Sequence, residues 1–329
     1  MVSGIALVGV LVIAIVEVVL LAFRPESGLG GLLQLVAPHL ALIGLVLAVF
    51  ALLWIPVRVA VAADLLLVTV LAIRFGAAWL SLPPAPPSAG SETISLETWN
   101  LEVGARSPGD TVAFIESHPA DVIALQELMP ADAEAIEADA SLTDRYPYRL
   151  LDTPATTDGL GLLSRYPLTD HGFRLEPLIQ TATLDLGGGR EVAIVHAHPQ
   201  HSDLRVVSGL NLPIGMNANG RNLELQLIRS RVDAARADLP TILVGDLNTA
   251  PTEPAFDRLS TGLLDVQQEV GQGPGWTWRP SRLESFGVGL LAIDHVIVTP
   301  DIEPLAIDSA CPPVGDHCLV STEVAVPAP

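Results

Sequence analysis

Acidic, amide and imidazole side chains border apolar segments at six places in the second part of the chain. Each of these residues alone is typical of a turn or a helix cap, because Asp and Asn often form such local structures. Together, however, they are the groups that metal-assisted phosphoryl chemistry requires. The six places are Asn100, Gln126-Glu127, His198, Asp246 with Asn248, Asp294-His295 and Asp316-His317.

These residue types suit a hard divalent cation and a phosphate group. Mg²⁺ takes oxygen ligands and is commonly held by one or two carboxylates, waters and substrate phosphate. An imidazole beside a carboxylate becomes more basic, and its cationic form can stabilise negative charge on phosphorus. A further Asp can orient the attacking water. The set therefore predicts a metal-dependent phosphohydrolase.

The elements that must position these groups are short apolar strands with helical segments between them. Their irregular order favours an α+β fold over strict βαβ alternation. In a sheet-based fold, strand ends of this kind can converge on one rim, where sites are built. Strands are predicted over 94–101, 122–125, 159–163, 192–196, 241–244, 295–298 and 319–324, and helices over 112–118 and 223–237.

Seven motifs in this region resemble, in order, those of the endonuclease/exonuclease/phosphatase superfamily. They are TWN, DVIALQE, GLLSRYPL, HAHP, GDLNTAP, IDH and GDH, and the resemblance spans roughly residues 93–325. It implies a four-layer αββα sandwich, in which two packed mixed sheets carry outer helices. It also implies hydrolysis of phosphoester bonds with a divalent metal, Mg²⁺ or alternatively Mn²⁺.

The resemblance assigns roles to residues that match the motifs. Glu127 is similar to the principal metal ligand, Asn100 to a residue that helps bind metal or phosphate, and Asp316 to a second metal-side carboxylate. The residues expected to act in catalysis are His198 at the scissile phosphate, Asp246 at the nucleophilic water, Asn248 as a phosphate-contacting amide, Asp294 orienting a histidine, and His317 stabilising the phosphate or acting as a base. Gly315 departs from the family pattern, which has Ser there, so a supporting hydroxyl is missing.

Three features near these motifs are less specific. His196 shares a face with His198 by period-two alternation and is interpreted as a neighbour on the substrate side. Trp278, with Trp276, lies where family members often carry a Thr-Trp element near the substrate, and core packing is the alternative. The long Asn- and Gly-rich stretch 203–221 is interpreted either as a mobile wall of the site or as a surface insertion.

The N-terminal part differs in composition. Three apolar stretches, 5–23, 32–55 and 59–80, each have the ~20 residues needed to cross a bilayer as a helix. Residues 1–81 are therefore predicted to be a membrane anchor with three transmembrane helices. A Pro-rich linker over 82–92 and a catalytic domain over 93–329 follow. Glu17, within the first stretch, either faces a helix–helix contact or has no role.

Charge restricts the substrates. Three of the 17 basic and three of the 37 acidic residues lie within residues 1–89, which leaves 14 Arg and 34 acidic residues for the rest of a chain that has no Lys. Such an acidic domain repels polyanions, so nucleic acid is not an expected partner. The expected substrate is a lipid-linked phosphate or pyrophosphate at the bilayer, because the tethered domain stays near lipid head groups and membrane-bound bacterial members of the superfamily have a similar layout.

Two other functions remain as alternatives. One is a membrane-anchored extracellular nuclease, and the other is a non-enzymatic sandwich that serves as a binding module. The predicted location is a multi-pass cell-membrane protein with an extracytoplasmic catalytic domain. Cys311 and Cys318 either form a disulfide, which would agree with that location, or are two free buried thiols.

Overall fold

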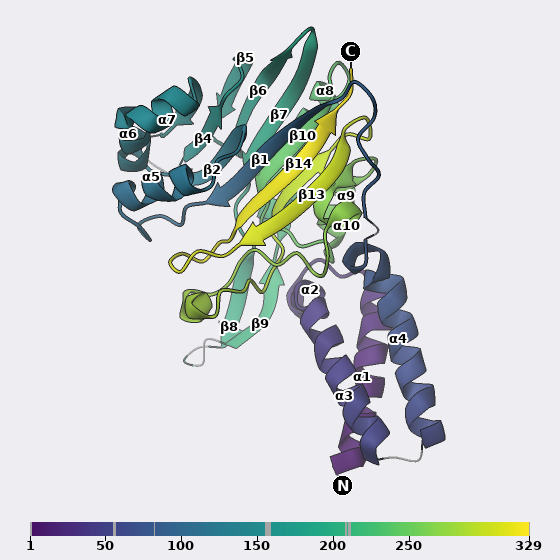
Figure 1. Ribbon diagram of the computed structural model, residues 1–329. Coiled ribbons are helices and arrows are strands. Elements are labelled where there is room, and N and C mark those ends of the chain that lie inside the picture. Colours follow the sequence, from purple (N-terminus) through teal and green to yellow (C-terminus); the bar gives the residue numbers. More distant parts are fainter. Residues whose placement is uncertain are drawn as a thin grey trace.

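A helical bundle and a β-sandwich make up the computed structural model (Figure 1). The structure describes residues 2–54, 57–81, 83–154, 159–207, 209 and 212–328. Leu82, the first residue of the predicted linker, and Ile55, the end of the second apolar stretch, lie outside the described residues.

The bundle is formed by the apolar N-terminal stretches. Its helices are α1 (Val2–Phe23), α2 (Gly28–Leu35), α3 (Ala37–Trp54) and α4 (Val57–Trp79). Two of these, α1 and α4, contain segments long and apolar enough to cross a membrane, and α2 with α3 supplies a third span if the bent pair counts as one. The second predicted helix is thus broken, with a 67° bend after Leu35. Pro38 explains the break, since a proline lacks the amide needed to continue the preceding helix.

Buried polar side chains link three helices of the bundle. Arg74 Nη1 of α4 lies 2.9 Å from Glu17 Oε2 of α1. Arg74 also donates to the side chain of Gln34 in α2, and Gln34 Nε2 donates to the Leu20 carbonyl at 2.9 Å. Of the two readings of Glu17, the helix–helix contact is confirmed.

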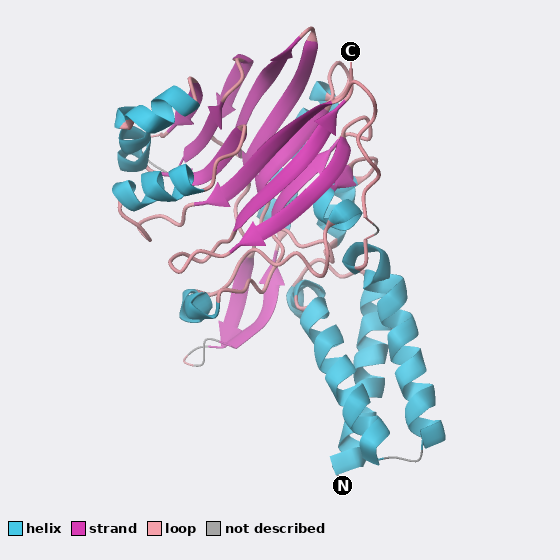
Figure 2. Ribbon diagram, in the orientation of Figure 1, coloured by secondary structure: helices cyan, strands magenta, loops and turns pink. Residues whose placement is uncertain are grey.

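Two six-stranded sheets pack face to face in the second part of the chain (Figure 2). The first has the strand order β13 (Glu303–Ala310), β14 (Leu319–Val326), β1 (Glu92–Asn100), β2 (Val122–Leu128), β4 (Gly159–Ser164), β3 (Tyr148–Asp152). The second has the order β11 (Leu264–Asp265), β12 (Asp294–Val298), β10 (Thr241–Asp246), β7 (Arg190–His198), β6 (Leu178–Gly187), β5 (Leu168–Arg174).

Helices cover the outer faces of both sheets. The first sheet carries α5 (Pro108–Ser117), α6 (Pro130–Ala138) and α7 (Ala140–Arg145), and the second carries α8 (Asn219–Ala235) and α9 (Pro254–Ser260). The short α10 (Val266–Val270) packs on β12 and β13, and a 3₁₀ helix spans Ser281–Phe286. The stretch 203–221 is a separate hairpin, β8 (Asp203–Val207) and β9 (Leu212–Asn217), followed by the start of α8.

The sandwich thus has four layers, helices, sheet, sheet and helices, and an apolar core fills each of the three spaces between them. Ile94, Ala124 and Ile194 belong to the middle layer between the sheets, where strands present alternate side chains inward. The outer layers lie under the helices, around Trp99 on one side and Phe256 on the other. The expected α+β four-layer αββα sandwich is confirmed.

Polar contacts fasten the sandwich to the bundle. Between α1 and α2, Glu26 accepts hydrogen bonds from Arg258 at 2.6 and 2.8 Å and from Asn222 Nδ2 at 2.9 Å. On α3, His39 stacks on Trp276 of the sandwich, with ring centroids 4.6 Å apart. The hairpin strand β9 packs along α2. These contacts fix which face of the sandwich is turned toward the bundle.

The inter-sheet layer makes a stability prediction. Ile194 is 1% exposed, so Ile194→Ala should leave a cavity and lower the free energy of unfolding by about 2–5 kcal/mol. Denaturant unfolding of the full chain in detergent, followed by intrinsic tryptophan fluorescence, measures this. Leu223→Ala on the exposed face of α8 is the matched control, with an expected change below about 0.5 kcal/mol. Equal losses in the two variants would contradict this account of the core.

Candidate active site

The strand directions bring the predicted site residues to one rim of the sandwich. At the centre of each sheet two strands run parallel, β1 with β2 and β7 with β10, so their carboxyl ends share that rim. Strands β12 and β14 are antiparallel to β10 and β1, and therefore begin there. The polar residues at these ends are Asn100, Glu127, His198, Asp246, Asp294 and His317.

An amide joins carboxylates of the two sheets. Asn100 Nδ2 donates to Glu127 Oε1 of the first sheet and to Asp246 Oδ2 of the second, each at 3.0 Å. Asn100 Oδ1 accepts from the Glu102 amide at 2.9 Å, which fixes the amide plane. In this geometry Asn100 orients two carboxylates.

Glu127 leaves the regular ladder of its strand. The pairing of β2 with β4 shifts register between Gln126 and Leu128, and Glu127 has a φ of +55°. A non-glycine residue rarely adopts this conformation, and such strain clusters at functional sites. Glu127 Oε2 accepts from the Val103 amide at 2.9 Å, which steadies the displaced side chain.

An acid–imidazole pair stands beside Asp246. His317 Nδ1 lies 3.0 Å from Asp294 Oδ2, and His317 Nε2 lies 3.6 Å from Asp246 Oδ2. The first contact orients the ring and leaves Nε2 toward Asp246. Ligand-type atoms of Asp246, Asp294 and His317 all lie within 4.8 Å of one another, and all three residues are buried.

Burial and charge set the proton affinities in this group. Burial and the neighbouring Asp294 carboxylate raise the pKa of Asp246 above its usual range. Burial would lower the pKa of His317, but the Asp294 and Asp246 carboxylates outweigh it and raise this pKa to about 10. The imidazole is therefore cationic at neutral pH, and Asp246 is a stronger base than an ordinary carboxylate.

His198 lies on the other side of Asp246. Its Nδ1 is 3.6 Å from Asp246 Oδ2 and its Nε2 is 3.7 Å from Glu127 Oε1. The imidazole thus stands between the two carboxylates that Asn100 joins, at the end of β7 where the sequence placed it.

Asp316 and Trp278 complete the wall of the site. Trp278 Nε1 donates to Asp316 Oδ2 at 2.9 Å, and the Asp316 amide donates to Glu102 Oε2 at 2.8 Å. Asp316 Oδ1 is buried without a hydrogen-bond partner. An unsatisfied buried carboxylate oxygen is costly, and a bound cation would satisfy it.

The donor set fits a divalent metal ion. Several carboxylates face one small region, where burial and then the Asp294 carboxylate raise the pKa of Asp246, and a cation there would favour the ionised carboxylates. Glu127, 26% exposed at its side chain, and Asp316 offer the oxygen ligands that Mg²⁺ prefers. The ligand-type atoms of Asp246, Asp294 and His317 are also close enough together to hold a divalent ion, which would require the neutral form of His317.

Asn248 is held by residues that the sequence analysis missed. Arg221 Nη1 donates to the Asn248 carbonyl at 2.7 Å, and Arg221 pairs with Glu253 at 2.7 Å, both side chains being buried. Asn248 has a φ of +50°, and its amide donates to Asp246 Oδ1 at 2.9 Å. Arg221 and Glu253 are 32 positions apart and belong to none of the motifs, so no sequence signal pointed to them.

His196 does not lie in the site. It is completely buried between the sheets, where its Nε2 is 2.7 Å from Gln126 Nε2 and its Nδ1 is 3.2 Å from Gln180 Oε1. The expectation that His196 contacts substrate is therefore wrong. The alternation of side chains along β7 puts both histidines on one face of the strand. His196, however, lies two residues before the strand end, where the opposite sheet covers that face.

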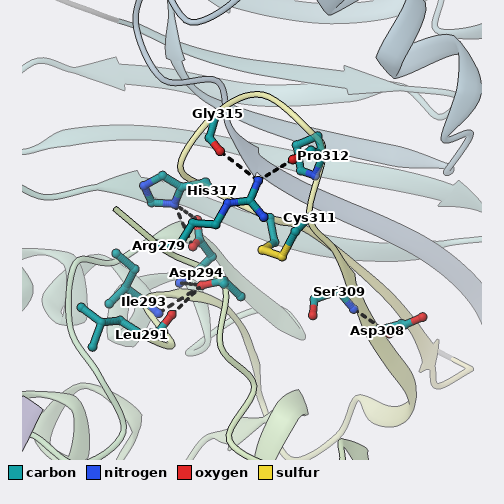
Figure 3. The surroundings of a disulfide bond; sticks show 12 residues. Arg279, Leu291, Ile293, Asp294, Asp308, Ser309, Cys311, Pro312, Gly315 and His317 are labelled. Carbon is teal, nitrogen blue, oxygen red and sulfur yellow. Dashed lines mark hydrogen bonds and ion pairs between the residues drawn. A yellow bond between two sulfur atoms is a disulfide. The ribbon is translucent and has the colours of Figure 1, made fainter. Parts of the chain in front are cut away.

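A disulfide supports the loop that carries Asp316 and His317. Cys311 and Cys318 are bonded to each other, so the first of the two readings of these thiols is confirmed (Figure 3). Arg279, a buried residue outside this loop, donates to the carbonyls of Pro312 and Gly315 within it. Gly315 has a φ of +102°, a conformation that favours glycine over the Ser of the family pattern.

The site opens into a cavity of about 950 Å³ between the rim and the bundle. Its lining includes the catalytic candidates Glu127, His198, Asp246, Asn248, Asp316 and His317, together with Trp278. The rest of the lining mixes apolar side chains, among them Leu35 of α2, Leu175, Leu178 and Leu204, with polar ones, among them Glu176, Gln200 and Glu224. The helical bundle thus contributes directly to the pocket that holds the polar cluster.

Comparison with known proteins agrees with this geometry. A model of the Endonuclease/Exonuclease/phosphatase family matches residues 98–317. No curated protein sequence matches the chain.

Solved structures share the fold. TDP2 from D. rerio, complexed with single strand DNA product, is 15% identical with a TM-score of 0.54, and the match covers 71% of this chain and 99% of that chain. An endonuclease/exonuclease/phosphatase family protein from Bacteroides thetaiotaomicron is 15% identical with a TM-score of 0.53, covering 72% and 99% respectively. One from Bacteroides vulgatus is 15% identical with a TM-score of 0.55, covering 71% and 98%.

Removal of the disulfide should weaken both the fold and the site. The bond closes a loop with a sequence separation of 7, so Cys311→Ala/Cys318→Ala should lower the free energy of unfolding by about 2–3 kcal/mol. Hydrolytic activity should fall as well, because Asp316 and His317 lie inside the loop. Reduction of the wild-type bond in the full chain serves as the control and should reproduce both effects. Unchanged stability after complete reduction would contradict this.

His196 should make stability depend on pH. Burial and the nearby His198 lower its pKa from 6.5 to about 3. Between these values the unfolded chain binds a proton that the native imidazole rejects, so stability should fall as the pH drops below 6.5. His196→Gln should reduce this slope by up to roughly 1.4 kcal/mol per pH unit. Urea unfolding between pH 4.5 and 5.5 measures this slope, and His171→Gln at an exposed position is the control. The prediction is wrong if His196→Gln and the wild-type chain lose stability equally with falling pH.

Proposed function

The chain belongs to the Endonuclease/Exonuclease/phosphatase family, whose members are phosphoesterase hydrolases, and we propose that it is a Mg²⁺-dependent phosphohydrolase of a lipid-linked phosphate or pyrophosphate. The observation that carries this proposal is the composition of the pocket. Groups suited to phosphoryl transfer line it together with apolar side chains of both parts of the chain, including Leu35 of the anchor and Leu175, Leu178 and Leu204 of the sandwich. A substrate with a phosphate head and an apolar tail would contact side chains of both kinds.

The chemistry follows from the positions of the side chains. Mg²⁺ bound by Glu127 and Asp316 would stabilise negative charge on phosphate oxygens. Asp246 accepts a proton from the attacking water, for which its raised pKa suits it. The cationic His317, held by Asp294, stabilises charge that develops on the phosphoryl group. His198 and Asn248 contact the phosphate, and Asn100 keeps Glu127 and Asp246 aligned.

Charge and redox chemistry support the substrate class and the location. The 34 acidic residues beyond residue 89, against 14 Arg, disfavour a polyanion such as DNA, although the TDP2 neighbour is complexed with a DNA product. Disulfides persist in oxidising compartments, so the Cys311–Cys318 bond supports an extracytoplasmic domain on a membrane anchor. A binding module without activity would not need the closely spaced acids and imidazoles of this rim.

Hydrolysis by the full chain in liposomes tests the proposal. A polyprenyl pyrophosphate, a phospholipid and plasmid DNA are compared, each with Mg²⁺ and with chelator, by phosphate release, by separation of the lipid products and by strand cleavage respectively. Activity should appear on a lipid substrate and disappear with chelator. Equal turnover of plasmid DNA would reject the substrate class and favour a nuclease, and full activity in chelator would reject the metal.

Asp246→Asn should lower kcat by about 10²–10⁴-fold, because the neutral amide cannot accept the proton of the attacking water. Asp170→Asn, the same change at an exposed position on β5, is the matched control and should leave kcat unchanged. Wild-type kcat in Asp246→Asn would exclude the assigned role.

A further inference from the structure

The β8–β9 hairpin exposes four aliphatic side chains. Leu204, Val206, Leu212 and Ile214 are between 44% and 56% exposed. Exposed aliphatic side chains gathered on one short element are typical of surfaces that contact protein or membrane. The hairpin pairs with neither large sheet, so the sandwich does not need it for closure.

The hairpin lies against the anchor and beside the pocket. Met216 of β9 forms a β-bridge with Gly28 at the start of α2, and its side chain approaches Gly31. Figure 1 shows the hairpin projecting from the sandwich on the side of the bundle, next to α2. Leu204 of β8 lines the catalytic pocket opposite Leu35. One short element thus joins the apolar surface of the bundle to the mouth of the site.

Its charge differs from that of the domain. Residues 203–217 contain one Asp and one Arg, so the hairpin is neutral within a chain of net charge −20. Other loops of the same rim also expose aliphatic side chains. Val103, whose amide binds Glu127, is 51% exposed, and Val314, two residues before Asp316, is 44% exposed.

We propose that the β8–β9 hairpin inserts its aliphatic side chains into the interfacial layer of the bilayer that the anchor spans, so that the pocket opens at the lipid surface. The proposal rests on the membrane anchoring of the proposed function. The bilayer is the occupant because the hairpin continues the exposed apolar surface of α1, α3 and α4 and is bridged to α2. Strands β8 and β9, which carry one Asp and one Arg, also approach lipid without the repulsion that the acidic domain would meet at anionic head groups.

Site-directed fluorescence tests the insertion without relying on activity. Both native cysteines are bonded to each other, so Ile214→Cys supplies a single thiol for a polarity-sensitive dye in the full chain. In liposomes, quenchers attached to shallow acyl positions should quench the dye, and aqueous iodide should not. Tyr148→Cys is the control, because Tyr148 is similarly exposed (40%) but lies on the rim opposite the site. Its strand partner Ser164 pairs with Val122, the first residue of β2, whereas the site lies at the other end of that strand.

Each outcome decides the proposal. Quenching by lipid at position 214 but not at 148 supports it. Equal access of iodide to both positions overturns it, and so does shielding from both quenchers, which would show that protein, such as a second copy of the chain, covers the hairpin. Insertion in a protein that hydrolyses no lipid substrate would refute the proposed function and leave this inference standing.

A kinetic readout separates surface binding from chemistry. Leu212→Ser/Ile214→Ser changes two residues that do not line the pocket. It should raise the apparent KM for a vesicle-borne substrate at least about fivefold, because apolar area buried in the interface is lost. Turnover of a water-soluble aryl phosphodiester should not change. An unaltered KM on vesicles would contradict a role of the hairpin at the bilayer.

Discussion

The close approach of carboxylates from two different sheets is the constraint on which the site depends. Glu127 and Asp246 share the amide of Asn100, and Asp294 approaches Asp246 from the adjacent strand β12. Like charges so close together repel, and burial adds to the cost. The cationic His317 offsets part of it, and a divalent ion would offset more. The sandwich therefore holds its acids in a pattern that favours cation binding.

Holding such a pattern requires rigid support behind it. The buried pair of Arg221 and Glu253 fixes the loop after β10, and the disulfide with Arg279 fixes the loop before β14. Glu127 departs from its strand at a register shift, with a backbone conformation that only firm surroundings maintain. The functional side chains are thus placed by loops whose own conformations depend on long-range contacts.

The difference between strand ends, which local sequence patterns determine, and loops, which long-range contacts determine, explains what could be predicted from the sequence. Strand ends follow from apolar runs, so the rim residues, including His198, could be predicted from the sequence, whereas the αββα layers came from the resemblance of the seven motifs to the family. A period-two pattern gives the face of a strand but not its depth, and His196 was therefore misplaced. The register shift at Glu127 and the pairing of Arg221 with Glu253 arise between segments distant in the chain. The break in the second apolar stretch is a further case, since Pro38 was hidden by high hydropathy.

The helical bundle contributes to the surroundings of the site, because Leu35 of α2 lines the same cavity. A phosphate group needs the charged rim, whereas an attached apolar chain needs surroundings without charge. A water-filled groove on an acidic domain could supply only the first. Leu35 of α2 and Leu204 of the hairpin line the same cavity as the polar cluster. A cavity lined from both parts of the chain requires the bundle to be fastened to the sandwich, and the hydrogen bonds that Glu26 accepts from Arg258 and Asn222 fasten it.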